Sequence, residues 1–249
     1  MFERSTVRRC APVAGAGAGV ALQVRALSTD VRLHSRRTNI VTQGERSPGV
    51  FVVLEGWAAR YNVLPGGARR ITALLLPGDF CDPNYGAPGP MDHSVTALTE
   101  CKLAHIDRDV LDEALGSAPH LARELRRSTL IEAATLRKWL VNMGLPAEPR
   151  LAHLVCELQM RMQAAGLVRG NSLHLPLTQE EMGDAIDATP VHANRVLRTL
   201  RERGLLTFLR GSLTIPNLSE LQRACDFDPC YLQPEGAGLS SSRGTMLAA

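Results

Sequence analysis

The sequence predicts an α+β protein in which an antiparallel β domain precedes a long helical segment and a small helix-turn-helix domain. Short apolar runs separated by Gly, Pro and Asn recur about every ten residues between 30 and 107, which is typical of an antiparallel sandwich or barrel. From 107 to 143 the apolar residues follow a helical period, with a break near Gly116 to Pro119. Residues 178–215 then contain two helix starts, a tight turn and a hairpin.

The composition is that of a globular protein with a weak positive charge. The 249 residues are 45% apolar and 21% charged, enough for one large or two small domains. The excess of 28 Lys+Arg over 25 Asp+Glu is too small to name a partner. Only Lys102 and Lys138 are lysines. The planar guanidinium of Arg suits phosphates and base edges, although a GC-rich genome would produce the same bias.

The cysteine pattern predicts a cytoplasmic protein with reduced thiols. Six cysteines are scattered through the chain without a CxxC pair or a His/Cys cluster of zinc spacing, so we expect no structural metal. No run of 18 strongly apolar residues is present, so we expect no membrane span. The segment 8–22 resembles a signal peptide only superficially, because its centre is Ala and Gly rather than Leu.

Changes of pattern divide the chain into five segments. Turn residues at 64–67 and 77–79 separate strands of the β domain, and 83–90 is too rich in Pro and Gly for regular structure. The predicted segments are a disordered N-terminus (1–25), a β domain (26–107), a helical connector (108–145), a winged helix-turn-helix domain (146–217) and a tail (218–249) whose residues from 235 onward are Gly/Ser/Ala-rich and expected to be disordered.

The helical connector carries an apolar stripe with two interpretations. The stripe packs on its own domain, or it pairs with the same helix of a second chain. Thr129 and Glu132 interrupt it, so its pattern leaves both interpretations open. The residues of the stripe are Leu121, Leu125, Leu136, Trp139 and Met143.

Two helix starts lie close together near the end of the chain. Thr178 is a good N-cap, and Glu181 three residues later completes a capping box for a helix over 179–186. After a turn at 187–189, Thr189 provides a second cap and Pro190 occupies the first helical position. The second helix is expected to run to Arg203, where Gly204 ends it. Two helices joined by so short a turn form a helix-turn-helix.

The second helix has a buried face and a face suited to DNA. Its apolar stripe is predicted to be Ala193, Val196, Leu197 and Leu200. Asn194 and Arg195 lie on the opposite face, and such side chains bond bidentately to adenine and guanine edges. The hairpin that follows is a wing whose tip, Arg210, can reach a phosphate. We predict contacts with double-stranded DNA from Thr178, Gln179, Thr189, Pro190, Val191, His192, Asn194, Arg195, Arg198 and Arg210.

Local charge favours the same interpretation. Residues 190–213 contain five arginines and one glutamate, a net charge of 5 − 1 = +4, whereas 146–249 contain ten arginines and eleven acids. Positive charge is thus concentrated on the proposed reading helix and wing, as phosphate binding requires. The alternative is a solvated basic face on a module that acts through protein contacts.

With these motifs, residues 30–217 resemble the Crp/Fnr family of bacterial transcription regulators. LTQEEMGDAIDATPVHANRVLRTLRERGLL resembles the helix-turn-helix of that family, and GER, VFVVLEGWA, ITALLLPGDF and VTALTECKLAHID resemble its cyclic-nucleotide-binding-type β-roll. The resemblance implies a β-roll sensor, a dimerisation helix and a homodimer on a two-fold symmetric site. It thereby favours dimerisation for the apolar stripe. RNA polymerase and a small-molecule effector are further candidate partners.

The reading helix departs from the family pattern. Arg195 matches the arginine of the family, and Asn194 occupies the variable position before it. Val191 stands where a glutamate is frequent and Pro190 where another polar reader can stand. We therefore do not expect the half-site preference of the best-known members. Val191 suits contact with a thymine methyl group instead.

The ligand motif departs further. Cyclic-nucleotide binders of the family carry Gly-Glu after PGDF and a later Arg-Ser or Arg-Thr that pairs with the phosphate. Here PGDF is followed by Cys81-Asp82-Pro83-Asn84, and 90–94 contains no arginine. A buried phosphate without a cation is costly, so we predict no tight binding of cyclic AMP. A cyclic-nucleotide-responsive regulator is the alternative. The candidate effector pocket comprises Gly78, Asp79, Phe80, Asp82, His93 and Ser94.

Other sensor and catalytic chemistries lack support in the sequence. An iron–sulfur centre needs grouped cysteines, and nothing singles out His93, His105 or His120 as a haem ligand. An adjacent carboxylate, Asp82, should raise the pKa of Cys81 and reduce its reactivity. There is no phosphate loop, HExxH or GxSxG motif. We therefore expect neither a cofactor nor an enzyme.

Overall fold

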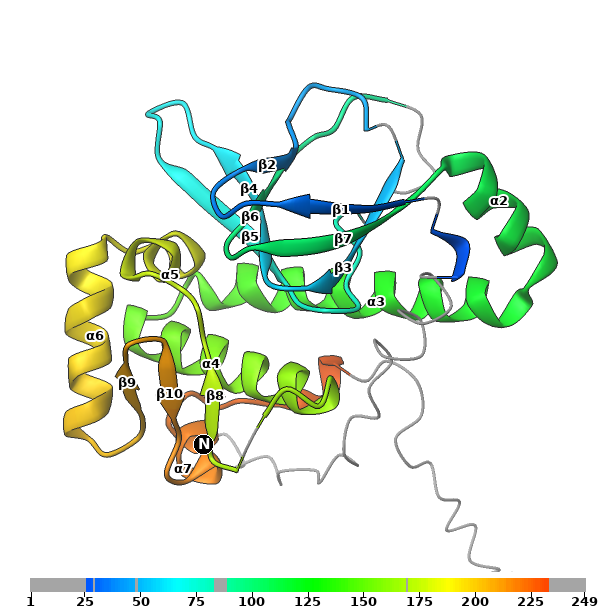
Figure 1. The fold of residues 1–249 in the computed structure, drawn as a ribbon. Coiled ribbons are helices and arrows are strands. Elements are labelled where there is room, and N and C mark those ends of the chain that lie inside the picture. The colour runs from blue at the N-terminus through cyan, green and yellow to red at the C-terminus, as the bar shows by residue number, and fades with distance from the viewer. Residues whose placement is uncertain (1–25, 29, 48, 83–88, 169, 233–249) are drawn as a thin grey trace, which may run out of the picture.

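The computed structural model describes residues 26–28, 30–47, 49–82, 89–168 and 170–232. It confirms the α+β class: a domain of two antiparallel sheets lies above a long helix, and a helical domain with a small sheet lies below and beside it (Figure 1). The disorder expected for 1–25 and from 235 onward falls outside the described residues. No helix in the described ranges is long and apolar enough to cross a membrane.

Seven strands form the N-terminal domain, and every strand pair is antiparallel. The sheet orders are β1-β7-β3 and β2-β6-β4-β5. Their inner faces enclose an apolar core that includes Val53, Val95 and Leu103. The strands are β1 (Asp30–His34), β2 (Asn39–Val41), β3 (Val50–Glu55), β4 (Ala58–Val63), β5 (Arg69–Leu75), β6 (Ser94–Ala97) and β7 (Cys101–Ile106).

A tight turn follows β5 and returns the chain to β3. Gly78 has φ +98°, a conformation that glycine adopts readily. The Asp79 carboxylate accepts a bond from the Leu76 backbone N–H at 2.7 Å. The Val53 N–H donates to the Asp79 carbonyl at 3.0 Å, and the Gly78 N–H donates to the Val53 carbonyl at 2.8 Å. The turn is therefore held rigidly against the β domain.

Three helices follow β7: α2 (Arg108–Ser117), α3 (Pro119–Asn142) and α4 (Ala147–Ala164). The break between α2 and α3 is at Ala118, where the sequence predicted one, and Pro119 occupies the first turn of α3. Helix α4 begins at Ala147, so Pro149 lies in its first turn. Proline is tolerated there because the N–H groups of a first helical turn have no intrahelical acceptor.

The C-terminal domain is built on α4. Its sheet has the order β8-β10-β9. The described part of the tail packs into the same core, where Leu221 and Leu232 are buried. Its elements are β8 (Ser172–His174), α5 (Gln179–Ile186), α6 (Pro190–Glu202), β9 (Thr207–Leu209), β10 (Ser212–Thr214), α7 (Leu218–Ala224) and the 3₁₀ helix η1 (Pro229–Leu232).

The apolar stripe of α3 is divided among three environments, which corrects the expectation of one dimer seam. Leu121 and Leu125 are 2% and 1% exposed, because they pack under β3 and β7 beside α2. Trp139 packs against the C-terminal core. Leu136 and Met143 keep 39% and 38% exposure. The sequence pattern could not separate these sets, because one helix face successively meets the β domain, the C-terminal domain and solvent.

Candidate DNA-reading helix and effector pocket

The two predicted caps are formed at the helix-turn-helix. The Thr178 hydroxyl accepts a bond from the Glu181 N–H at 3.1 Å, and the Glu181 carboxylate accepts one from the Thr178 N–H at 2.7 Å. The Thr189 hydroxyl accepts a bond from the His192 N–H at 3.2 Å, with Pro190 in the first turn of α6. Each cap satisfies backbone donors that the helix itself cannot satisfy.

The turn between α5 and α6 depends on Gly183, which is not among the predicted site residues. Asp187 adopts a left-handed conformation, with φ +55°, and the Ala188 N–H bonds to the Gly183 carbonyl at 2.9 Å. A Cβ atom at position 183 would collide with the Ala188 carbonyl oxygen. The sequence does contain a sign of this close packing. Glycine is unfavourable inside a helix, so a glycine within a short predicted helix indicates that a side chain would not fit there.

Helix α6 stands at the edge of the molecule with one face open to solvent (Figure 1). Its buried residues are Ala193, Val196, Leu197 and Leu200, the stripe that the sequence predicted. Most of the ten predicted DNA-contacting residues are exposed, and Thr178 is half-buried at the start of α5. The exposed ones are Gln179, Thr189, Pro190, Val191, His192, Asn194, Arg195, Arg198 and Arg210.

The arginines of this surface differ in their partners. Arg198 Nε lies 2.8 Å from a Glu202 carboxylate oxygen, and both side chains are largely exposed. Arg195 has no ion pair with any other described residue. Arg210 and Gly211 have φ +51° and +78°, a mirror-image turn that presents the arginine at the tip of the wing. Arg195 and Arg210 thus remain available for an external anion.

The β domain docks on α5 through ion pairs. Arg69 Nε lies 2.7 Å from an Asp184 oxygen, and Arg36 lies 3.6 Å from Glu181. Arg70 of β5 pairs with Asp187 in the turn before α6. Burial raises the pKa of the Asp184 carboxyl, although the Arg69 bond opposes this effect. These pairs fix the orientation of the helix-turn-helix relative to the β domain.

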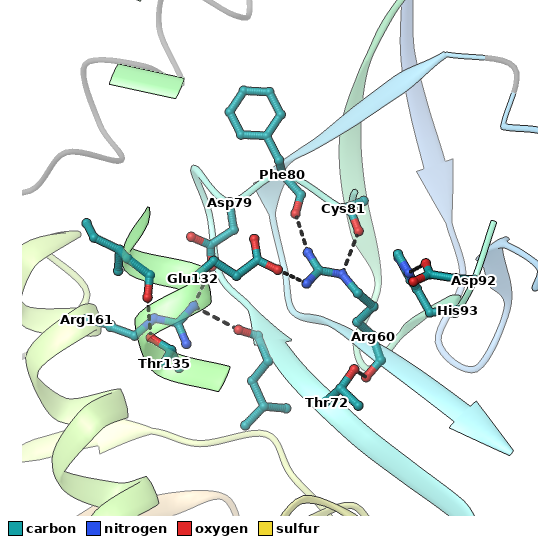
Figure 2. Close-up of polar contacts among 12 residues, drawn as sticks. Arg60, Thr72, Asp79, Phe80, Cys81, Asp92, His93, Glu132, Thr135 and Arg161 are labelled. Atoms are coloured by element: carbon teal, nitrogen blue, oxygen red, sulfur yellow. Dashed lines mark hydrogen bonds and ion pairs between the residues drawn. The ribbon is translucent and has the colours of Figure 1, made fainter. Parts of the chain in front are cut away.

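A buried arginine occupies the β domain beside the predicted pocket. Arg60 of β4 is 4% exposed. Its guanidinium donates to the carbonyls of Cys81 at 3.0 Å and Phe80 at 3.1 Å, and it forms an ion pair with Glu132 of α3 (Figure 2). Arg60 is not among the predicted site residues, although an arginine within an apolar strand is rarely buried without a specific partner.

A second network joins the β domain to the C-terminal domain. Arg161 of α4 donates to the Leu74 carbonyl at 2.8 Å and to the Asp79 carboxylate at 2.7 Å (Figure 2). One turn earlier, Glu157 is fully buried and accepts bonds from Trp139 Nε1 and the Tyr231 hydroxyl, both at 2.9 Å. Burial raises the pKa of the Glu157 carboxyl, and Arg161 opposes this effect.

A cavity of about 150 Å³ lies between these networks. Its lining is mainly apolar and comes from residues 73–80, α3, α4 and Leu232. Of the predicted pocket residues, Gly78, Asp79 and Phe80 line it, whereas Asp82, His93 and Ser94 do not. Figure 2 shows His93 on the opposite side of Arg60 from Arg161.

The three predicted pocket residues that do not line the cavity, Asp82, His93 and Ser94, are buried elsewhere in the β domain. His93 Nδ1 lies 2.6 Å from Asp92, and the Ser94 hydroxyl accepts a bond from the Gln43 N–H at 2.9 Å. Cys81 is fully buried, and burial raises its pKa to about 12. The expected direction of that shift is correct, but desolvation is the main cause rather than the adjacent carboxylate.

Known proteins resemble the chain in both domains. The cyclic nucleotide-binding domain model matches residues 31–117, and the Crp-like helix-turn-helix domain model matches 149–224. The transcriptional activator FnrL of Cereibacter sphaeroides is 28% identical over 181 residues, which are 70% of this chain and 71% of the relative. The nitrogen fixation regulation protein FixK of Rhizobium meliloti is 28% identical over 71% of this chain and 77% of the relative.

Solved structures show the same fold. FixK2 from Bradyrhizobium japonicum superposes with a TM-score of 0.69 and 22% identity, covering 78% of this chain and 96% of that chain. The c-di-GMP responsive regulator CLP of Xanthomonas campestris has a TM-score of 0.64, with 80% and 99% covered. The two domain models, the curated relatives and the shared fold place the chain in the Crp/Fnr family of transcription regulators.

Proposed function

We propose that this chain is a sequence-specific DNA-binding transcription regulator that reads a two-fold symmetric operator as a homodimer. The observation that carries the proposal is the outer face of α6. There Asn194 and Arg195 are exposed side by side above an apolar stripe that fixes the helix in place. An unpaired guanidinium and an amide on an exposed helix are suited to base edges in the major groove.

The surrounding groups position such a helix on the duplex. The N-terminus of α6 carries a partial positive charge that favours a phosphate. The wing places Arg210 beyond the end of the β9–β10 hairpin, where it can contact the adjacent backbone. Val191, 73% exposed, is the apolar member of the reading face and suits a thymine methyl group.

The second half of α3 is the proposed dimer surface. Leu140 and Val141 are 73% and 69% exposed there, and Leu130, Leu136 and Met143 are also exposed. Leu136, Leu140 and Met143 are spaced by four and three residues, so they share one helix face. An apolar helix face of this kind favours burial against a second copy. RNA polymerase remains a candidate partner of the DNA-bound dimer.

The cavity between the domains is the proposed effector site, and its chemistry favours a small, mainly apolar molecule. Arg161 is the only basic side chain among its described lining residues, and it is bound to Asp79 and Glu157. The neighbouring Arg60 is bound to Glu132. A cyclic phosphate would have to break one of these ion pairs, so we expect cyclic AMP to bind weakly. Micromolar or tighter binding by calorimetry would overturn this.

The function is tested by selecting DNA sites from a random pool with reduced protein at one fixed salt concentration. A symmetric consensus without nucleotide is expected. Recovery only with cyclic AMP would replace the effector proposal with a nucleotide-responsive regulator. No enrichment under either condition would contradict DNA reading by the protein alone, and would favour either a regulator that needs another signal or a module that acts through protein contacts.

The reading residue is tested with the selected site. Arg195→Ala should weaken binding to that site by about 1–3 kcal/mol and relax the preference at one base pair. Arg223→Ala is the matched control, because it removes an exposed arginine of the same domain that lies outside α6 and the wing. Equal effects of the two variants would contradict the assignment.

A further inference from the structure

Two thiols face each other in the core of the C-terminal domain. Cys156 lies in the middle of α4, and Cys225 caps the end of α7, 69 positions later. Their sulfur atoms are 4.0 Å apart. Cys156 is fully buried, and Cys225 is 6% exposed. Neither residue belongs to the exposed face of α6 or to the lining of the cavity between the domains.

The pKa values of the two thiols shift in opposite directions. The hydrogen bond between them lowers the pKa of Cys225, whereas the same bond and burial raise the pKa of Cys156. The last backbone bonds of α7 are long, since the Cys225 and Asp226 N–H groups donate across 3.4 and 3.5 Å, whereas the Phe227 N–H donates to the Gln222 carbonyl at 2.9 Å. Cys225 is 6% exposed and Cys156 is 0% exposed, so Cys225 is the more accessible nucleophile.

We propose that Cys156 and Cys225 form an oxidative modification site that closes to an intramolecular disulfide when the protein meets hydrogen peroxide. The Cys225 thiolate attacks one peroxide oxygen, the O–O bond breaks, and the leaving hydroxide takes a proton to become water. The Cys156 sulfur then attacks the resulting sulfenic sulfur, the S–O bond breaks, and the hydroxyl leaves as water with the Cys156 proton. Two thiols and one peroxide thus give one disulfide and two waters.

The geometry requires a modest movement. A disulfide bond is about 2 Å long, so the sulfur atoms must approach by about 2 Å. Rotation of the Cys225 side chain together with a small shift at the end of α7, where the Cys225 and Asp226 backbone bonds are long, would supply this approach. The crosslink would enclose β8, α5, α6, β9, β10 and α7 in one loop. A loop of that length should raise the thermal midpoint of the domain by about 5–10 °C.

Peptide mapping of the full chain tests the site. Reduced protein is treated with hydrogen peroxide, remaining thiols are blocked with N-ethylmaleimide, and the digest is analysed without reductant. A crosslinked peptide joining Cys156 to Cys225 is expected. Cys81 and Cys101 are internal controls, since both are buried and Cys101 Sγ donates to the Trp57 carbonyl at 3.0 Å instead. Alkylation of both Cys156 and Cys225 in oxidised protein, or a crosslink of either to another cysteine, would overturn the proposal.

A variant pair separates the crosslink from general oxidation. Cys225→Ser should abolish both the crosslinked peptide and the peroxide-dependent rise in thermal midpoint, whereas Cys81→Ser should keep both. A rise that persists in Cys225→Ser would assign the effect to another group and contradict the proposal. The wild-type peptide map decides the question even if a serine at position 225 prevents folding.

Discussion

Replacing Glu132 with Gln tests whether the ion pair with Glu132 keeps the Arg60 guanidinium of the β domain from binding a phosphate. The Arg60 guanidinium is 4% exposed and donates to the Cys81 and Phe80 carbonyls. Glu132 is the carboxylate that balances its charge, and the Glu132 side chain is 21% exposed. Glutamine keeps the shape and one acceptor oxygen but leaves the buried positive charge uncompensated.

The expected cost follows from this geometry. Removing one partner of a fully buried ion pair costs about 3–5 kcal/mol. Glu132 retains some contact with solvent and the two carbonyl bonds persist, so we expect about 2–3 kcal/mol for Glu132→Gln. In a chain of this size that loss corresponds to a fall in the thermal midpoint of about 5–10 °C. The double variant Arg60→Met/Glu132→Leu should recover much of the loss, because no buried charge remains.

Thermal unfolding and calorimetry are the assays. Glu124→Gln is the matched control, because Glu124 also lies on α3 beside the cavity but pairs with Arg127 only loosely, at 3.8 Å. The control should cost no more than about 0.5 kcal/mol. Glu132→Gln should also bind cyclic AMP more tightly than the wild type, since a guanidinium becomes available. Equal stability of the two variants with unchanged nucleotide affinity would refute the reasoning.

Three further predictions concern the turn, a buried histidine and the dimer surface. Gly183→Ala should destabilise the C-terminal domain by about 1–3 kcal/mol and weaken operator binding, because the new methyl group collides with the Ala188 carbonyl. His153 is 2% exposed, and burial lowers its pKa to about 4 from 6.5. The unfolded state therefore takes up its proton first, and stability falls by about 3 kcal/mol as the pH drops from 6.5 to 4, a loss that His153→Phe should remove in thermal scans. Leu140→Asp should shift sedimentation from dimer to monomer, whereas the equally exposed Leu33→Asp in β1 should not.

Each of these predictions has an outcome that contradicts it. Wild-type stability in Gly183→Ala would mean that the turn can relax. An unchanged acid profile in His153→Phe would show that this imidazole does not control the transition. Dissociation by Leu33→Asp instead of Leu140→Asp would place the dimer surface on β1 rather than on α3.

The reading helix could be predicted because its signals are local. The caps at Thr178 and Thr189 act over three residues, and the buried stripe of α6 repeats every three or four residues. The helix break at Ala118 and the wing also follow from short-range patterns. The DNA contacts themselves stay predictions, although the structure exposes most of the side chains concerned.

The pocket and the division of α3 depended on the tertiary structure. Arg60 and Glu132 are 72 positions apart, and Arg161 and Asp79 are 82 apart. Cys156 and Cys225 meet across 69 positions. The sequence by itself determined the fold class and the two faces of α6, since helical and strand periods bury or expose side chains within a few residues. Only the tertiary structure decided which charges neutralise each other and which part of α3 stays exposed, because those contacts arise when distant elements pack together.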